Sequence, residues 1–163
     1  MTPLLTVRTA ALADITGMTE MESGPETARY LGRIGRAYHE RAMADPDQEQ
    51  IVAEVGDTLV GFVVLAGLRN PDRQVELRRI VVAHSHRGTG QGRALFRAAV
   101  SRAYHQHNAC QVWLDVKPDN AKGRALYDSE GFVLDGTIPD PMDETGVLLL
   151  MRHIPGKYVS RLD

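Results

Sequence analysis

Three glycines separated by single residues, Gly88, Gly90 and Gly92, lie in a segment whose chemistry suits phosphate binding. They follow a β-branched run and precede an apolar-patterned run, as in a turn from a strand into a helix. Amides at a helix start have no partner within the helix and lie at the positive end of its dipole. Arg87 and Arg93 could add charge at either end of the loop. The segment predicts a phosphate cradle, and a surface turn without a ligand stays open as the alternative.

The sequence of the loop does not match two common nucleotide-binding motifs. A Walker A loop requires GxxxxGK[ST], which the sequence does not contain. A dinucleotide fingerprint requires GxGxxG, but Arg93 stands where the third glycine would follow Gly88 and Gly90. Asp115, at the end of the next predicted strand, superficially mimics the ribose-binding acid of that fingerprint. The missing glycine and the loop's place halfway along the chain argue against a dinucleotide site.

Three features outside the loop could take part in the same chemistry. Asn120 is followed seven residues later by Tyr127, which lies within the stretch "LYDSEGF". Glu76 precedes Arg87 by eleven residues, on the run that leads into the loop. The last apolar run is "LLLMRHI" at residues 148–154. Each feature alone is common, and their joint order and spacing make them informative.

Together with the RxxGxG spelling of Arg87, Gly90 and Gly92, these features resemble the GCN5-related N-acetyltransferases, the GNAT superfamily. The likeness is best over residues 74–134. It implies acetyl-CoA as acyl donor, no metal, and direct transfer of the acetyl group to an amine of a small molecule or peptide in a ternary complex. A noncatalytic acyl-CoA-binding or regulatory domain stays open as the alternative.

The resemblance also implies roles for individual residues. The backbone of Val81 and Val82 would pair with the pantetheine arm, and the Val82 amide would face the thioester oxygen. Asn120 would hydrogen-bond the cofactor arm or fix the last helix, and Tyr127 would protonate the departing thiolate. Gly123 departs from the family, where alanine is common, at a helix propensity cost of about 1 kcal/mol. The pyrophosphate would be bound, mostly through backbone amides, by Arg87, Gly88, Thr89, Gly90, Gln91, Gly92 and Arg93.

Glu76 is the predicted general base. An amine like that of lysine has a pKa near 10.4, so about one molecule in 2,500 is neutral at pH 7, a gap of roughly 4.6 kcal/mol. Its proton therefore needs a route. Glu76 shares strand parity with Ile80 and Val82, which favours it. Two alternatives remain open. A chain of water molecules could act as the base, or Glu76 could be a half-exposed strand residue that only pairs with Arg78 or Arg79.

The elements that must position these residues follow from periodicity and turn signals. The predicted order is β-α-α-β-β-β-α-β-α-β-β, with a hairpin at Gly56-Asp57 and a second helix that includes residues 30–42. The loop lies in a crossover unit made of strand 74–83, helix 90–105 and strand 110–116. The resulting fold class is α/β (α+β).

The resemblance sharpens this fold class. It implies a GNAT-like mixed, mostly antiparallel central sheet of six to seven strands, flanked by about four helices. A single acetyltransferase domain would occupy residues 1–154, followed by a C-terminal tail at 155–163. A homodimer, with the tail docked on a second subunit, is left open.

Composition limits the classes of protein. With 163 residues, 43% hydrophobic and 25% charged, one ordinary globular domain is expected. The net charge of -2 and the lack of a long basic run give no indication of nucleic-acid binding. No apolar run approaches the roughly 20 residues that span a bilayer. The single cysteine and an N-terminus unlike a signal peptide favour the cytoplasm.

The histidines and the cysteine are not expected to do chemistry. The pair His84 and His86 and the pair His105 and His107 have no third ligand spaced to join them, so no metal site is predicted. Cys110 is expected in the core rather than as an acyl-carrying nucleophile, because no helix start or basic neighbour lowers its pKa.

The acceptor site is the least readable part of the chain. The resemblance implies that the N-terminal helices and segments 67–75 and 136–146 form it. Glu20 and Glu22 are weaker candidates for such a cleft or for general base. The acids of segment 136–146 are a weak sign of a cationic acceptor: a polyamine, an aminoglycoside or a peptide amine.

Overall fold

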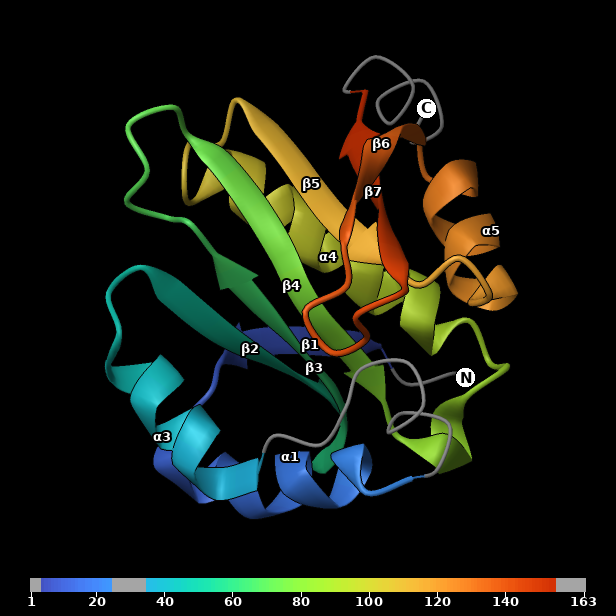
Figure 1. Ribbon diagram of the computed structural model, residues 1–163. Helices are drawn as coiled ribbons and strands as arrows, with labels where there is room; N and C mark the ends of the chain where they lie inside the picture. Colours follow the sequence, from blue (N-terminus) through green and yellow to red (C-terminus); the bar gives the residue numbers. More distant parts are fainter. Residues whose placement is uncertain (1–3, 25–34, 155–163) are drawn as a thin grey trace.

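The computed structural model describes residues 4–24 and 35–154, and one seven-stranded sheet runs through them (Figure 1). The strands are β1 (Leu5–Thr9), β2 (Gln48–Val55), β3 (Thr58–Ala66), β4 (Gln74–Val82), β5 (Gln111–Val116), β6 (Phe132–Pro139) and β7 (Val147–His153). Their order in the sheet is β1-β2-β3-β4-β5-β7-β6. Neighbours are antiparallel except β4 and β5, which are parallel.

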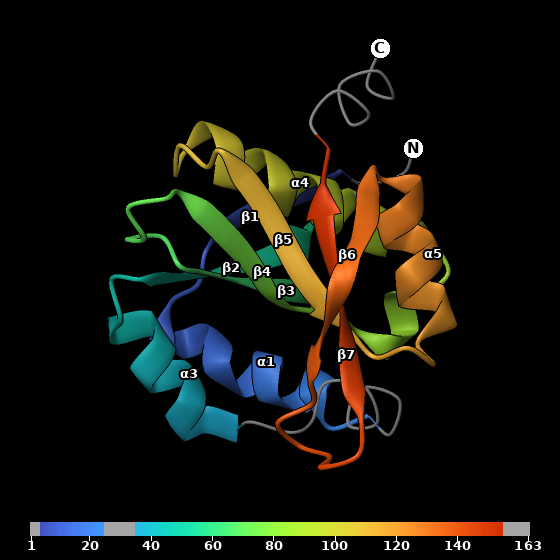
Figure 2. The same cartoon turned by 45° about the horizontal axis from the view of Figure 1, so that its top comes forward.

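Helices cover both faces of the sheet. The described ones are α1 (Ile15–Glu22), α3 (Gly35–Ala44), α4 (Gln91–His105) and α5 (Ala121–Ser129), with short 3-10 turns at Leu12–Asp14 and His84–His86. α1 and α3 lie together on one face, while α4, which links β4 to β5 in the chain, packs on the other face, mainly against β3 and β4 (Figure 2). None of these described helices is long and apolar enough to cross a membrane. The glycine segment thus stands where β4 ends and α4 begins.

The core forms one layer on each face of the sheet. The larger cluster packs Phe96 of α4 against Phe132 of β6 and the inward side chains of the central strands. The smaller cluster joins Met18 of α1 to Phe62 of β3. Each strand of the centre is therefore covered on both sides, and α1 and α3 occupy the face opposite α4.

One glycine allows α4 to approach β3 closely. A Cβ added at Gly61 would come within 2.8 Å of both the Leu95 side chain and the Val81 carbonyl oxygen. The carbonyl belongs to β4 and cannot move without disturbing the sheet. Gly61 therefore sets how closely Leu95 of α4 packs on β3.

β4 and β5 separate after a short parallel contact. Their pairing joins Gln74–Glu76 to Gln111–Trp113, and the described strands make no ladder contact beyond it. β4 continues to Val82 and β5 continues to Val116. The edge of β4 that faces β5 is therefore open over residues 77–82, next to the glycine segment.

The predicted fold class, a mixed and mostly antiparallel sheet with flanking helices, is confirmed. The hairpin at Gly56, with φ 62°, joins β2 and β3 as predicted. The expectation for Cys110 is wrong: it is exposed and donates to the Asp72 carbonyl (2.9 Å), because it lies in the turn before β5. Residues 25–34, which include the start of the predicted second helix, and the tail 155–163 lie outside the described residues.

Candidate active site

The glycine segment turns the chain from β4 into α4 through two left-handed residues. Gly88 has φ 77° and Gly90 has φ 83°, a region that side chains disfavour. A Cβ added at either position would meet no atom within 4 Å. These glycines are thus required by the shape of the backbone, and the space beside them is open to a ligand.

The start of α4 presents backbone amides without a side-chain cap. Gly90 is the N-cap residue and makes no side-chain hydrogen bond. Gln91, Gly92 and Arg93 then carry the amides for which an α-helix has no internal acceptor. The Thr89 hydroxyl donates to the backbone carbonyl three residues earlier (2.6 Å) and steadies the turn. This arrangement suits an anionic oxygen.

The two arginines at the ends of the loop differ in what their side chains do. Nε of Arg87 donates to the Val82 carbonyl (3.1 Å), so this guanidinium stays beside the loop. Nη1 of Arg93 donates to Ser129 Oγ (2.9 Å) and to Glu130 Oε2 (2.8 Å), which ties α4 to the end of α5. The expected charge of Arg93 at the loop is therefore directed elsewhere, and Arg93 offers the loop its amide.

The backbone along the open edge of β4 follows from the pairing with β3. The Ala83 amide donates to the Val60 carbonyl (2.8 Å). In an antiparallel pair, successive residues direct their peptide groups alternately to the two sides. Val81 therefore directs its backbone groups to β3, whereas Ile80 and Val82 direct theirs to the open edge. The prediction of backbone pairing with a ligand arm is wrong for Val81, and Val82 keeps the geometry that it needs.

A β-bulge interrupts β4 in its middle. The register with β3 pairs Leu77 with Leu65 and Arg79 with Val64, so Arg78 is an extra residue without a partner in the ladder. One extra residue changes which side chains share a face on the two sides of a bulge. The residues before and after Arg78 must therefore be assigned to faces separately.

The bulge decides the face on which Glu76 lies. Its neighbour Leu77 packs in the cluster under α4, and so do Ile80 and Val82. Because successive strand residues point to opposite faces, Glu76 points to the face that α1 and α3 cover. The predicted shared parity of Glu76 with Ile80 and Val82 is therefore wrong.

Glu76 and Arg78 form a partly exposed ion pair. Nε and Nη2 of Arg78 both donate to Glu76 Oε1, at 3.0 and 2.9 Å. The second oxygen, Oε2, has no hydrogen-bond partner among the described residues. The pairing with Arg78 that the sequence left open does occur, and it occupies only one of the two carboxylate oxygens.

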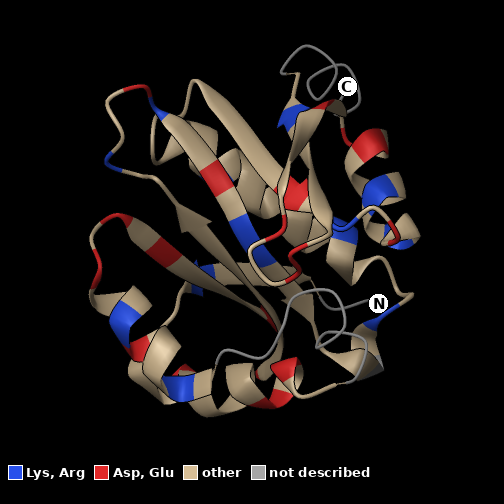
Figure 3. Ribbon diagram, viewed as in Figure 1, with Lys and Arg blue, Asp and Glu red and all other residues tan. Residues whose placement is uncertain are grey.

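Two further carboxylates belong to this neighbourhood. Burial raises the pKa of Asp115 on β5, the charges of Glu76 and Asp140 raise it further, and Arg78 offsets part of the rise. Figure 3 shows acidic and basic positions close together on β4 and β5. Sequence reasoning considered Asp115 only as a mimic of a ribose-binding acid. The parallel crossover, which places β5 beside β4, is the signal that could have linked it to Glu76.

Tyr127 is the buried residue of α5, and its side chain belongs to the larger core cluster. Its ring packs on Phe96 (5.2 Å between centroids) and near Phe132 (6.4 Å). Burial, with a contribution from the charge of Asp115, raises the pKa of Tyr127 to about 12. The phenol therefore keeps its proton at neutral pH, as a proton donor must, and its ring also serves the core.

Asn120 is the N-cap of α5. Its Oδ1 accepts from the Gly123 amide (3.0 Å), the bond that defines a helix cap. A Cβ at residue 123 would come within 2.8 Å of Asn120 Nδ2. Of the two predicted roles for Asn120, fixing the last helix has a contact in the structure, and Gly123 leaves room for the capping side chain.

A buried polar network ties α1 and α3 to β4. Glu22 Oε1 accepts from Nε of Arg79 (3.1 Å) and lies 3.0 Å from His39 Nε2. His39 Nδ1 lies 2.8 Å from Gln50 Oε1. Glu22 and His39 are fully buried. Glu22 therefore braces the helices against the strand after the bulge and does not face an open cleft, and sequence reasoning missed this network because its members are far apart in the chain.

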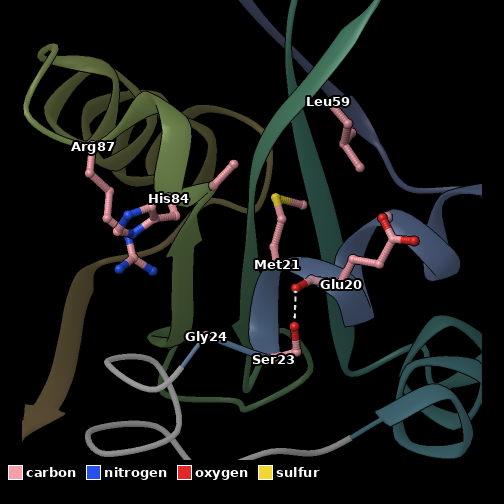
Figure 4. Close-up of a pocket in the computed structure, with 9 residues that line it drawn as sticks. Glu20, Met21, Ser23, Gly24, Leu59, His84 and Arg87 are labelled. Atoms are coloured by element: carbon pink, nitrogen blue, oxygen red, sulfur yellow. Dashed lines mark hydrogen bonds between the residues drawn. The ribbon is translucent and has the colours of Figure 1, made fainter.

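A pocket of about 590 Å³ opens between α1 and the loop that follows β4 (Figure 4). Glu20 and Met21 lie on its α1 side, and His84 and Arg87 lie on its loop side. Leu59 adds an apolar wall. Glu20, unlike Glu22, thus lines a cleft, and Arg87 lies across that cleft from it (Figure 4).

Within residues 4–24 and 35–154, no group of three or more His, Cys, Asp and Glu side chains is placed to hold a metal ion. His107 lies 2.8 Å from Glu49 Oε1 and is part of an ion network. His84 borders the pocket. His84 and His107, one from each histidine pair, therefore lie in different surroundings.

An open β4 edge that ends in a left-handed glycine loop at a helix start invites comparison with known families. The model of the Acetyltransferase (GNAT) family matches residues 13–132. The chain belongs to the GNAT family. This confirms the resemblance drawn from the loop and from the spacing of Asn120 and Tyr127.

Relatives within the GNAT family agree with this assignment. The chain is 36% identical over 93 residues to the N-alpha-acetyltransferase RimI of Mycobacterium tuberculosis, covering 56% of each chain. It is 27% identical over 127 residues to the spermidine N(1)-acetyltransferase of Vibrio cholerae, covering 76% of this chain and 73% of that protein. The chain spans 59% of the length of three mycobacterial relatives that are named uncharacterized N-acetyltransferases.

A solved structure shares the fold over nearly the whole chain. It is the spermidine N-acetyltransferase from Vibrio cholerae in complex with CoA and spermine, with a TM-score of 0.82 and 22% identity. The match covers 95% of this chain and 98% of that one. The arrangement of seven strands and flanking helices is therefore that of the GNAT fold.

Proposed function

We propose that this chain is an acetyl-CoA-dependent N-acetyltransferase that moves the acetyl group directly to an amine in a ternary complex. The observation that carries the proposal is the open β4 edge, which leads from Glu76 past Val82 into the glycine loop. Family membership and relatives named as N-acetyltransferases support it.

The residues present fit acetyl-CoA. The amides from Gly88 to Arg93 suit a pyrophosphate, and the left-handed glycines keep side chains away from it. The open edge at Ile80 and Val82 suits the amides of a pantetheine arm, as an added strand would pair. Acetyl-CoA would supply the activated thioester, and the Val82 amide would donate to its carbonyl oxygen.

Proton transfer would use Glu76 and Tyr127. An ammonium acceptor must lose a proton before it can attack, and Glu76 Oε2 is the oxygen available to take it. A thiolate leaves more readily when a donor protonates it, and the pKa of Tyr127, raised to about 12 chiefly by burial, keeps that phenol protonated. We therefore propose Glu76 as the general base and Tyr127 as the proton donor, the roles that the sequence predicts.

The acceptor would be a cationic amine of the polyamine type. Glu76, Asp115 and Asp140 bring three carboxylates into one neighbourhood on the acceptor side of β4. The pKa of Asp115 is raised partly by repulsion from the other two carboxylates, so a bound ammonium group would stabilise the ionised form of Asp115. The relative from Vibrio cholerae that is named as a spermidine acetyltransferase supports this class.

The test is release of free thiol from acetyl-CoA with three amine classes. Spermidine should be acetylated with a higher kcat/KM than an aminoglycoside or a peptide with a free N-terminus. A peptide preferred by more than tenfold would overturn the polyamine assignment. Binding of acetyl-CoA without turnover on a broad amine panel would favour the noncatalytic acyl-CoA-binding alternative.

A charge-removing variant tests the acid cluster directly. Asp115→Asn should raise the KM for spermidine about fivefold, the effect of one nearby charge, and leave the KM for acetyl-CoA unchanged. Asp57→Asn, in the exposed β2–β3 turn, is the matched control and should change neither. Equal effects of the two variants would show that net charge, rather than the site, attracts the acceptor.

We also propose a cytoplasmic location, supported by the single free cysteine, Cys110. Fractionation of cells that produce the protein would test the location. The homodimer stays a prediction, and sedimentation of the purified protein at several concentrations would test it.

A further inference from the structure

The bulge in β4 places an arginine beside the predicted base. Arg78 is the residue that the β3–β4 register leaves over. Its guanidinium reaches back along the strand to Glu76, two residues earlier. In an uninterrupted strand, residue 78 would have a ladder partner, whereas the bulge leaves Arg78 outside the ladder with its guanidinium on Glu76.

Arg78 uses its donors on one oxygen of Glu76 and remains accessible. Two nitrogens donate to Oε1 at 3.0 and 2.9 Å, while the side chain stays 42% exposed and that of Glu76 is 14% exposed. An amine that approaches Oε2 of Glu76 must therefore come close to the guanidinium. The two cations would repel each other, and the repulsion grows with the charge of the acceptor.

The groups that face Arg78 come from four parts of the described fold. Glu76 lies on its own strand, Asp115 lies on β5 and Tyr38 lies on α3, and each interacts with Arg78. Asp45, in the turn between α3 and β2, interacts with it as well. Burial acts to lower the pKa of Arg78, and Glu76 and Tyr38 outweigh this effect, so the arginine stays charged. Arg78 is thus a permanent positive charge beside Glu76 and Asp115, while Arg79 is engaged by Glu22.

We propose that Arg78 is a specificity-determining residue that limits how much positive charge the acceptor can bring to Glu76. The inference rests on the proposed function, because it concerns the acceptor of that reaction. Arg78 would favour acceptors with one ammonium group near the reacting nitrogen over those with a second one close to it. Its removal would widen the site toward compact, multiply charged amines.

The experiment compares two compact acceptors of equal carbon number and different charge, propylamine and 1,3-diaminopropane. The measured quantity is the ratio of kcat/KM for the diamine to that for the monoamine. Arg78→Gln should raise this ratio about fivefold, as expected for one charge at a partly exposed site. The rise should shrink when added salt screens the charges. Because the ratio compares two amines on one protein, a general loss of activity cancels.

Two variants control the experiment. Arg78→Lys keeps the charge and should keep the wild-type ratio. Arg8→Gln removes an arginine of similar exposure, 44%, that pairs with Asp14 and Glu54 at the far edge of the sheet. Arg8→Gln should also keep the ratio, and an equal rise there would overturn the proposal in favour of a net-charge effect.

The outcomes separate the two proposals. A wild-type protein that acetylates both amines, with a ratio unchanged within twofold in Arg78→Gln, overturns the role of Arg78 and leaves the proposed function intact. A wild-type protein that releases no thiol with any amine overturns the proposed function, and the role of Arg78 with it. A fivefold rise in Arg78→Gln alone supports both.

Discussion

Two carboxylate clusters on opposite sides of the molecule differ in how completely their charge is matched. Glu49 on β2 accepts from Arg102 (2.7 Å), His107 (2.8 Å) and Thr9 (2.7 Å). Burial would raise the pKa of Glu49, but these donors outweigh it and hold the pKa at about 2. Asp115 has no comparable set of donors, and its pKa lies above the usual value.

The comparison shows that donors, rather than burial, decide how a carboxylate behaves here. Both residues are partly buried, and burial is the first cause acting on each pKa. The Glu49 cluster joins β2 to α4 with its charge satisfied, which suits a structural role. The cluster of Asp115 and Glu76 is short of positive charge, as is common where a cationic ligand completes a site.

The largest expected effect tests whether the two clusters differ in function. Glu76→Gln should lower kcat/KM for an amine acceptor about 10²-fold, because a general base is lost. The pH profile of kcat/KM should change with it. Steady-state kinetics across pH provide the measurement, and Glu49→Gln is the control that should retain wild-type kcat/KM. An unchanged pH profile in Glu76→Gln would eliminate Glu76 as the base.

A somewhat smaller effect on turnover is expected at Tyr127, whose pKa is influenced by the charge of Asp115. Tyr127→Phe should lower kcat about 30-fold, roughly 2 kcal/mol, because the leaving thiolate loses its proton donor. The ring contacts with Phe96 and Phe132 should persist, so the affinity for acetyl-CoA measured by calorimetry should not change. Normal turnover in this variant would remove the role of Tyr127 and leave it as a core residue.

The Glu49 cluster should make the free energy of unfolding depend on pH in acid. The pKa of Glu49 is lowered in the folded protein from its usual value of 4.5 to about 2. Its stabilisation is therefore fully present above pH 4.5 and is lost as pH falls toward 2. The difference between these two pKa values corresponds to roughly 3.4 kcal/mol, and solvent screening of this partly buried group should reduce the measured loss to about 2 kcal/mol. The loss is measured as the free energy of unfolding in urea.

Glu49→Gln should already lack this stabilisation at pH 7 and should show a weaker decline between pH 4.5 and 2. Asp115→Asn should not reproduce that behaviour, because the pKa of Asp115 is shifted in the opposite direction. Identical acid profiles for the two variants would remove the distinction between the clusters.

The smallest effect concerns the cap of the helix that carries Tyr127. Asn120→Ala should cost about 1 kcal/mol of unfolding free energy, because the Gly123 amide loses its acceptor. Gly123→Ala should stabilise the protein only in the Asn120→Ala background, since the new Cβ otherwise meets Asn120 Nδ2 at 2.8 Å. A double-mutant cycle measures this coupling, and additive effects of the two changes would contradict it.

Much of the fold could be predicted because its signals are local. The hairpin at Gly56, the strand before the glycines and the apolar period of α4 each follow from neighbouring residues. Cys110 was misplaced because strand boundaries are weakly specified, and a shift of one residue moves a side chain from the core to a turn.

The candidate site was predicted less completely, for two reasons. A bulge inserts a residue without a clear sign in the sequence, so the face of Glu76 was assigned incorrectly. The backbone direction of Val81 was assigned incorrectly because adjacent strand residues direct their peptide groups to opposite edges, and which edge is open depends on the pairing with β3. Arg93 was expected to serve the loop, yet its partner Glu130 lies 37 residues away. Such partners are chosen by tertiary packing, which pattern reasoning does not reach.

The sequence by itself determined the glycine loop, the family and the helix cap at Asn120, and it supplied the residues proposed as base and proton donor, because these depend on short motifs and their spacing. Only the tertiary structure decided which residues meet. The bulge turned Glu76 toward α1 and α3 and put Arg78 beside it, and the parallel start of β5 brought Asp115 to both. Charge interactions depend on distance in space, so the balance of charge around Glu76 and Asp115 exists only in the folded chain.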